Sequence, residues 1–168
     1  MPVTSVQQKG FTLVELILGM VVFAIALTIV TSLIAPQAKQ SAEPLIQLKA
    51  AKLAQATINE ILAKSYDENS DRSPPFLRCD EKPSGCTNTL GPEEASRDLY
   101  DDVDDYHNLV ISDAGEDYPG FSVSVNVAID GDYDQTTSDG QHIAKRIDVV
   151  VNTPIGERYA FQAYRGNF

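Results

Sequence analysis

The stretch Gly10-Phe11-Thr12-Leu13-Val14-Glu15-Leu16 decides how this chain folds, because it places a carboxylate at the head of a long apolar segment. Residues 16–35 are 20 successive positions without a charge. A helix rises about 1.5 Å per residue and needs about 20 apolar residues to cross the hydrocarbon core of a bilayer. The sequence therefore predicts a membrane-spanning helix over residues 11–35.

Glu15 is the residue in this stretch that needs an explanation. A carboxylate inside a membrane helix is costly, so it indicates a function and requires a partner of opposite charge. The alternative is that Glu15 lies at the membrane interface and stabilises the positive end of the first helical turn. Both interpretations are open at this point.

Residues 1–10 form a short polar leader whose only cation is Lys9. A secretory signal has a basic start, then an apolar stretch, then small residues at the cleavage site. Here the order differs, since cleavage after Gly10 would remove the leader and keep the apolar segment. Glycine lacks a Cβ, so a protease can approach the backbone closely at this position.

The run from Lys9 to Glu15 closely resembles the processing motif of type IV prepilins. The resemblance implies that a prepilin peptidase cuts between Gly10 and Phe11 and that the new Phe11 amine is methylated. It also implies that Glu15 neutralises this amine, in its own chain or in a neighbouring pilin subunit, and so sets the register of a filament. The precursor would be a single-pass protein of the inner membrane with a periplasmic domain, which then enters an extracellular filament.

The remainder, residues 36–168, has room for one small globular domain. Pro36 and Pro44 each remove a backbone donor, so we expect them to kink or interrupt the helix. We expect the helix to continue past the membrane. Between Pro44 and Lys64 it is amphipathic, and its apolar stripe recurs every three or four residues. The stripe comprises Ile46, Ala50, Leu53, Ala54, Thr57, Ile58, Ile61 and Leu62.

Beyond residue 119 the hydrophobic period changes from that of a helix to that of a strand. Alternation predicts strands over residues 121–129, around 147–151 and over 158–164, with a turn at 152–156. Three successive strands form an antiparallel meander that can bury one face against the helical stripe. The predicted fold is thus α+β, and the resemblance implies the type IV pilin arrangement of a long helix packed on a β-meander.

Cys79 and Cys86 are the only cysteines, and Pro83 and Gly85 can turn the chain between them. In an oxidising compartment they would form a structural disulfide. A metal site is less favoured because both histidines, His107 and His142, are distant in sequence. A redox pair would have two intervening residues, whereas six are present.

Two acidic clusters follow. Asp130, Asp132 and Asp134, with Asp139 further on, are spaced like the start of a calcium loop. An EF-hand is rejected, since Gln135 replaces its turn glycine and Gln141 its terminal glutamate. A looser calcium site and a solvated hairpin loop both remain open. For residues 101–105 we expect a tight turn whose side chains bond their own backbone.

A net charge of −11 argues against nucleic acid as a partner. No nucleophile–base constellation is evident in the sequence, so we expect no enzymatic activity and no cofactor other than the calcium just considered. The runs at residues 31–39, 101–107 and 161–168 are similar to minor pilins of the mannose-sensitive haemagglutinin pilus. This resemblance implies a minor pilin acting in filament assembly or initiation, with a further role in adhesion. The alternatives are a minor pseudopilin of a type II secretion system and a membrane-anchored binding or adhesin module.

Overall fold

The computed structural model describes residues 10, 12–71, 73–136 and 141–168, and of residues 33–42 it describes the backbone alone. The helix α1 extends over Leu13–Leu62, and the strands are β1 (Val110–Ile111), β2 (Ser122–Ile129), β3 (Ala144–Asn152) and β4 (Arg158–Gly166). Short 3-10 turns occupy Cys79–Glu81, Arg97–Leu99 and Asp104–Tyr106. The structure separates into two compact units, residues 1–45 and residues 46–168, which we describe one at a time.

The first unit contributes the N-terminal turns of α1. The expected interruption at the prolines was wrong, because residues 36 and 44 both lie within the helix. A proline in a helix loses one hydrogen bond to the preceding turn, and the turns on either side of it keep theirs. The backbone at these two positions therefore stays helical.

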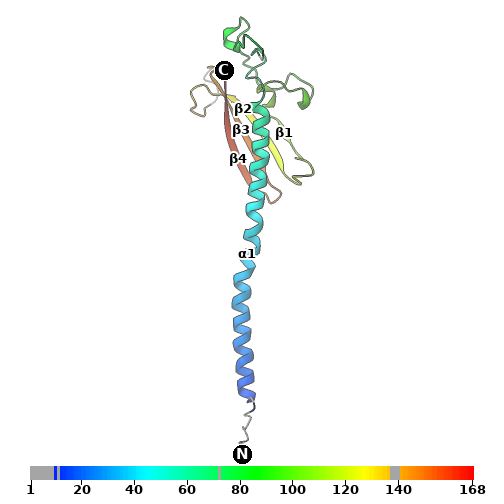
Figure 1. The fold of residues 1–168 in the computed structure, drawn as a ribbon, viewed down its shortest axis with the longest axis vertical. Coiled ribbons are helices and arrows are strands. Elements are labelled where there is room, and N and C mark those ends of the chain that lie inside the picture. Colours follow the sequence, from blue (N-terminus) through cyan, green and yellow to red (C-terminus); the bar gives the residue numbers. More distant parts are fainter. Residues whose placement is uncertain (1–9, 11, 72, 137–140) are drawn as a thin grey trace, which may run out of the picture. The chain divides into compact units, whose positions relative to one another are not determined.

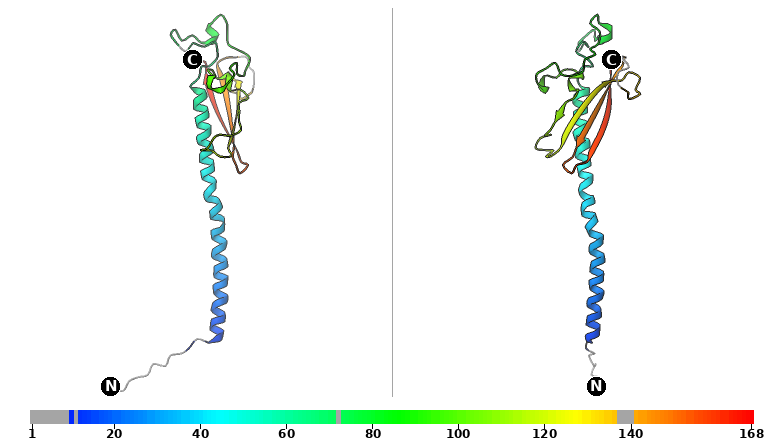
Figure 2. Two further views of the ribbon diagram at one scale, coloured as in Figure 1. Left: turned by 90° about the vertical axis from the view of Figure 1, so that its right-hand side faces the viewer. Right: turned by 180° about the vertical axis from the view of Figure 1, so that it is seen from behind.

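The second unit is an antiparallel sheet in the order β1-β2-β3-β4, with the last turns of α1 alongside it (Figures 1 and 2). Val125 pairs with Val149, and Val149 pairs with Phe161, so one face of three strands is continuously apolar. The predicted α+β meander is confirmed. The sequence missed β1, whose two residues are too few to show an alternation.

The core lies between this sheet face and the predicted helical stripe. On α1, Ala50, Ala54, Ile58 and Ile61 are buried, and the two alanines allow the sheet to approach closely. The sheet presents the inward residues expected from the alternation, and all are buried: Phe121, Val123, Val125, Val127, Ile129, Ile147, Val149 and Val151.

The acidic segment, residues 101–106, also contributes to the core. Val103 and Tyr106 are fully buried, and the Tyr106 hydroxyl donates to Glu60 on α1 at 2.9 Å. Asp102 Oδ1 accepts from the backbone N–H of Asp104 at 2.7 Å and of Asp105 at 3.2 Å. The expected side-chain-bonded turn is confirmed, and it is buried.

Lys145 on β3 is a fully buried cation that joins this turn to the end of α1. Its Nζ donates to Asp104 Oδ2 at 2.7 Å and to the Tyr66 carbonyl at 2.6 Å. Asp67 Oδ2 lies 3.4 Å away, and the Tyr66 ring lies 4.2 Å beneath the ammonium. A buried charge is tolerated only when it is paired and hydrogen-bonded, as it is here.

We expect Lys145→Met to lower the free energy of unfolding by about 3–5 kcal/mol, because it leaves buried carboxylates without their cation. The matched control is Lys82→Met, which breaks a partly exposed pair with Asp71 and should cost less than about 1 kcal/mol. Urea unfolding of the full chain in detergent, followed by near-ultraviolet circular dichroism, measures both. Equal losses of stability in the two variants would contradict the role of Lys145 as the buried counter-charge.

The loss of stability in Lys145→Met should also depend on pH. Burial raises the pKa of Asp104 to about 7, against the opposing effect of Lys145. A carboxyl whose folded pKa is raised binds more protons folded than unfolded, so its contribution to stability falls as the pH rises toward that pKa. Without Lys145 that pKa rises further, so Lys145→Met should cost more at pH 8 than at pH 6.

Candidate functional site

The N-terminal segment has a defined helix start just after the predicted cleavage position. Thr12 Oγ1 accepts from the backbone N–H of Glu15 at 3.3 Å, and the Thr12 carbonyl accepts from Leu16 at 3.2 Å. Thr12 is thus the N-cap of α1. Gly10 lies before the helix and is exposed, with nothing within 4 Å of the position that a Cβ would take. Phe11 lies outside the described residues.

Glu15 is exposed in the first turn of α1, where the partial positive charge of the helix end favours a carboxylate. Within the part of the chain that the structure describes, no lysine or arginine pairs with it. The counter-charge role of Glu15 toward Phe11 stays a prediction, because Phe11 lies outside the described residues.

Leu13–Ser32 is long and apolar enough to cross a membrane, with a mean hydropathy of 2.7. It is the one such segment in the part of the chain that the structure describes, and none of it is buried within the chain. Its hydroxyls bond its own backbone: Thr28 donates to Ala24 at 2.8 Å, Thr31 to Leu27 at 2.8 Å and Ser32 to Ile29 at 2.7 Å. This surface therefore needs no water to satisfy its hydroxyl groups.

A comparison with known protein families bears on this same segment. The prokaryotic N-terminal methylation motif matches residues 6–31, which include Gly10, Glu15 and most of the apolar span. The chain carries this methylation motif. The match supports a prepilin-like protein, and the α+β architecture is consistent with the type IV pilin fold. No curated protein and no solved structure matches the chain.

The two cysteines form a disulfide, with their Cα atoms 4.7 Å apart. Asn167 ties this loop to the end of the chain. Its Nδ2 donates to Asp80 Oδ1 at 3.1 Å and to the His142 carbonyl at 2.9 Å. The disulfide loop is therefore held against the residue that follows β4.

The predicted hairpin cluster is partly assembled. Asp130, Asp132 and Asp134 offer oxygens within 4.8 Å of one another, while Asp139 lies outside the described residues. Arg146 already compensates Asp130, with Nη1 3.1 Å from Oδ2. A bound calcium ion would have to share this carboxylate with Arg146, so calcium at the hairpin stays a prediction.

The outer part of this hairpin is organised by its own backbone. Asp132 Oδ1 accepts from Asp134 N–H at 3.2 Å, and Asp134 Oδ1 accepts from Thr136 N–H at 2.7 Å. The Thr136 hydroxyl, which also donates to Asp134, holds the pKa of Asp134 below its usual range. These bonds join residues 132–136 without any ion.

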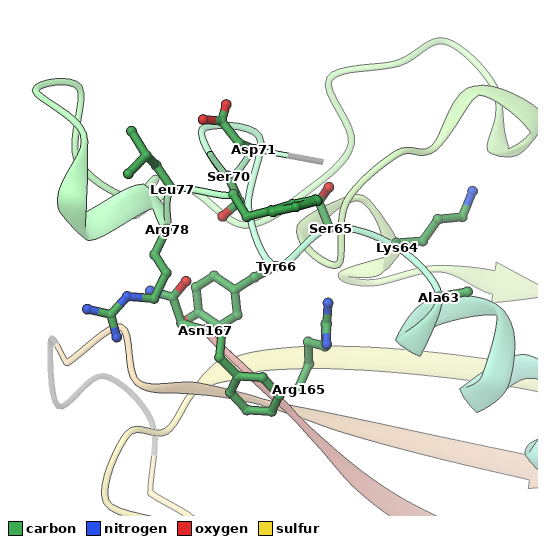
Figure 3. Close-up of a pocket in the computed structure, with 12 residues that line it drawn as sticks. Ala63, Lys64, Ser65, Tyr66, Ser70, Asp71, Leu77, Arg78, Arg165 and Asn167 are labelled. Atoms are coloured by element: carbon green, nitrogen blue, oxygen red, sulfur yellow. The ribbon is translucent and has the colours of Figure 1, made fainter. Parts of the chain in front are cut away.

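A cavity of about 500 Å³ opens beside the disulfide loop (Figure 3). Figure 3 shows side chains entering it from the segment after α1 and from the end of the chain. They are Ala63, Lys64, Ser65, Tyr66, Ser70, Asp71, Phe76, Leu77, Arg78, Arg165, Asn167 and Phe168. Its arginines and aromatic rings give it a mixed lining that specifies no single ligand chemistry.

Several interacting residues were not anticipated from the sequence. Thr12 is recognisable afterwards as a threonine preceding an apolar helix, a common capping signal. Lys145 gave no signal, since it is one lysine at the start of an alternating strand. Glu68, Glu93 and Glu94 meet the acidic segment only through loops of irregular structure.

We expect native exported protein to show no reactive thiol, and reduction to release both Cys79 and Cys86. Replacing both by serine should lower the free energy of unfolding by about 2–3 kcal/mol. The loss is at the low end for a disulfide, because closing a short loop removes little entropy from the unfolded chain. Ellman titration and urea unfolding measure the two effects. Ser84→Ala, within the same loop, is the control. Two freely reactive thiols in native exported protein would contradict the prediction.

Proposed function

We propose that this chain is a minor subunit of a type IV pilus of the mannose-sensitive haemagglutinin type, similar to its D-type minor pilin. The match of the methylation motif to residues 6–31 carries the pilin-like part of the proposal. The similarity at residues 31–39, 101–107 and 161–168 is the ground for the minor role and the haemagglutinin type. The globular unit of α1 turns and a β-meander supports it, because such a unit can stand outside a filament of packed apolar helices. The chain would act in filament assembly or initiation, with other pilin subunits as its partners.

The local structure around Gly10 supports the proposed processing. The helix begins only at Leu13, so the Gly10–Phe11 bond precedes the regular hydrogen bonding of α1. A peptidase binds its substrate as an extended strand, and an exposed glycine before the helix permits this. Cleavage leaves Phe11 as a cationic amine near the membrane, ready for methylation.

Glu15 would then supply the charge that this amine requires. Within the apolar environment of a membrane or a filament core, an unpaired carboxylate and an unpaired amine are both costly. Pairing Glu15 with Phe11 of its own or a neighbouring subunit removes both costs. Since only one register places the two groups together, the pair would also select how subunits align.

The same motif would serve a minor pseudopilin of a type II secretion system. Immunogold labelling of sheared surface filaments separates the two functions, because a secretion pseudopilus does not normally extend from the cell. Labelled filaments would support the pilus. Labelling confined to the cell envelope would support the pseudopilus or a plain membrane anchor.

We predict that Gly10→Val blocks processing, because a branched side chain obstructs the peptidase next to the cleaved bond. The control is Gly19→Val, within the apolar helix, where nothing lies within 4 Å of an added Cβ. Intact mass and N-terminal sequencing measure both variants in a host that has the peptidase. Processing should persist in Gly19→Val. A mature terminus other than Phe11 in the wild type would refute the assignment.

We predict that Glu15→Ala inserts into the membrane normally, because the helix becomes more apolar, but enters filaments at least tenfold less often than the wild type. Glu43→Ala is the matched control, since Glu43 is an exposed glutamate of the same helix. Quantitative immunoblots of membranes and sheared filaments measure the ratio. Equal recovery of Glu15→Ala and wild type in filaments would count against the counter-charge role.

A further inference from the structure

The cavity beside the disulfide loop (Figure 3) is lined by an arginine that has no carboxylate partner. Two other basic residues of the lining are engaged elsewhere. Arg78 forms ion pairs with two carboxylates of the disulfide loop, at 3.3 and 3.6 Å, and Lys64 Nζ donates to the Tyr100 carbonyl. Arg165, in the last turn-ward residues of β4, forms no ion pair with any carboxylate of the described residues.

The place of Arg165 in the sheet explains why it lacks a carboxylate. Arg165 is paired with Lys145 across β4 and β3, so the two cations lie opposite one another on the same face. Lys145 engages both Asp67 and Asp104. Arg165 is therefore a second cation beside a buried one, and an anion bound to it would reduce the repulsion between the two.

Arg165 also has an unsatisfied donor. Its Nε is buried and has no hydrogen-bond partner among the described residues. Its Cζ lies 6.0 Å from the centre of the Phe168 ring, a contact that satisfies no N–H group. Ser70 Oγ, from the same lining, is likewise buried without a partner in the described chain. Buried polar groups are normally hydrogen-bonded, so two such groups in one cavity indicate that it accepts a polar ligand.

The charge of the lining favours an anion over a cation. Asp71 is the acidic residue among the described residues that line the cavity, and it is already paired with Lys82. Three basic residues stand against it, although the whole chain has a net charge of −11. The chain as a whole repels anions, so an anion would bind where basic groups gather.

The cavity also offers an apolar contact surface. Phe76, Leu77 and Phe168 line it and are 62, 38 and 91% exposed. The backbone of Phe76 has a φ of 57°, which is uncommon for a bulky residue, and strain of this kind is concentrated at functional sites. Covering these side chains with an apolar group would remove them from water and so favour binding.

We propose that this cavity binds a small organic carboxylate, with Arg165 as its counter-charge and the apolar body of the ligand against Phe76, Leu77 and Phe168. The lining as a whole is mixed, and the uncompensated Arg165 is what selects an anion. The guanidinium is a planar fork that matches the two oxygens of a carboxylate. The volume of about 500 Å³ lies within the range of small-molecule sites, about 300–1,000 Å³.

The test uses the full chain in a non-ionic detergent and benzoate as the probe, because benzoate combines a carboxylate with an apolar ring. Benzamide is the neutral probe of similar shape. Saturation-transfer NMR on the ring protons measures binding relative to micelles without protein, and thermal unfolding is followed as the probe concentration rises. Arg165→Gln removes the proposed counter-charge. Arg158→Gln is the matched control, since Arg158 is an exposed arginine of the same strand and lies outside the lining.

We expect benzoate to bind to the wild type and to Arg158→Gln and to raise their melting temperatures. Benzamide should bind at least tenfold more weakly than benzoate. Arg165→Gln should bind benzoate at least tenfold more weakly than the wild type, because a charge-assisted pair is lost. Arg165→Lys should recover part of the affinity, since it restores the charge without the planar fork.

Without a probe, all three variants should melt near the wild-type temperature, which shows that they fold. Neither readout requires filaments, so the outcome is independent of the pilus proposal. Absence of benzoate binding by the wild type would overturn the inference. Equal binding of benzamide and benzoate would also overturn it, because the cavity would then have no preference for an anion. Unchanged binding in Arg165→Gln, or an equal loss in Arg158→Gln, would refute the role of Arg165.

Discussion

The organisation of the globular unit depends on the buried ammonium of Lys145. Lys145 lies on the inner face of β3. Its ammonium pairs with Asp104 of the acidic turn and with Asp67 of the segment after α1, and it donates to the Tyr66 carbonyl. Removing a charge of this kind from water is compensated only by good geometry on every side. The irregular residues between α1 and the sheet therefore have one arrangement that satisfies this cation. The positions of the surrounding loops follow from it.

The contacts of Lys145 explain why neighbouring carboxylates of this unit are compensated in different ways. Asp102, Asp104 and Asp105 occupy one short turn, and the backbone N–H groups of that turn stabilise Asp102 and Asp105. Lys145 compensates Asp104 on the inner side. Asp105 is hydrogen-bonded instead to the side chain of Glu94, and this bond raises the pKa of Glu94 to about 7. Lys145, the one fully buried lysine among the described residues, pairs with Asp104 and Asp67. The carboxyls of Asp105 and Glu94 therefore depend on a shared proton to lie together.

The sequence predicted the regular elements because their signals are local. Alternation placed Val123, Val125 and Val127 on the inner face of β2, and the recurring stripe on α1 was correct at Ala50 and Ile61. The expected interruption at Pro36 and Pro44 was wrong, because the loss of one hydrogen bond at each proline leaves the helical turns on either side intact. The meeting of Glu68 with Glu94 and Asp101 could not be predicted, since it depends on backbone bonds such as Ser65 to Asp101 that join irregular segments. No periodicity records such contacts.

The two units divide the chemistry of the chain between them. Leu13–Ser32 satisfies its hydroxyls internally and presents apolar side chains outward, so it suits lipid or other apolar helices. The globular unit carries nearly all of the acidic residues, which favours solubility in water and disfavours aggregation. Glu15 and Glu43 lie outside that unit, and Glu15 is the carboxylate at the head of the apolar segment. In a chain whose other charges are segregated from the apolar helix, an acid kept at that position needs a compensating charge there, and cleavage after Gly10 would create one four residues away.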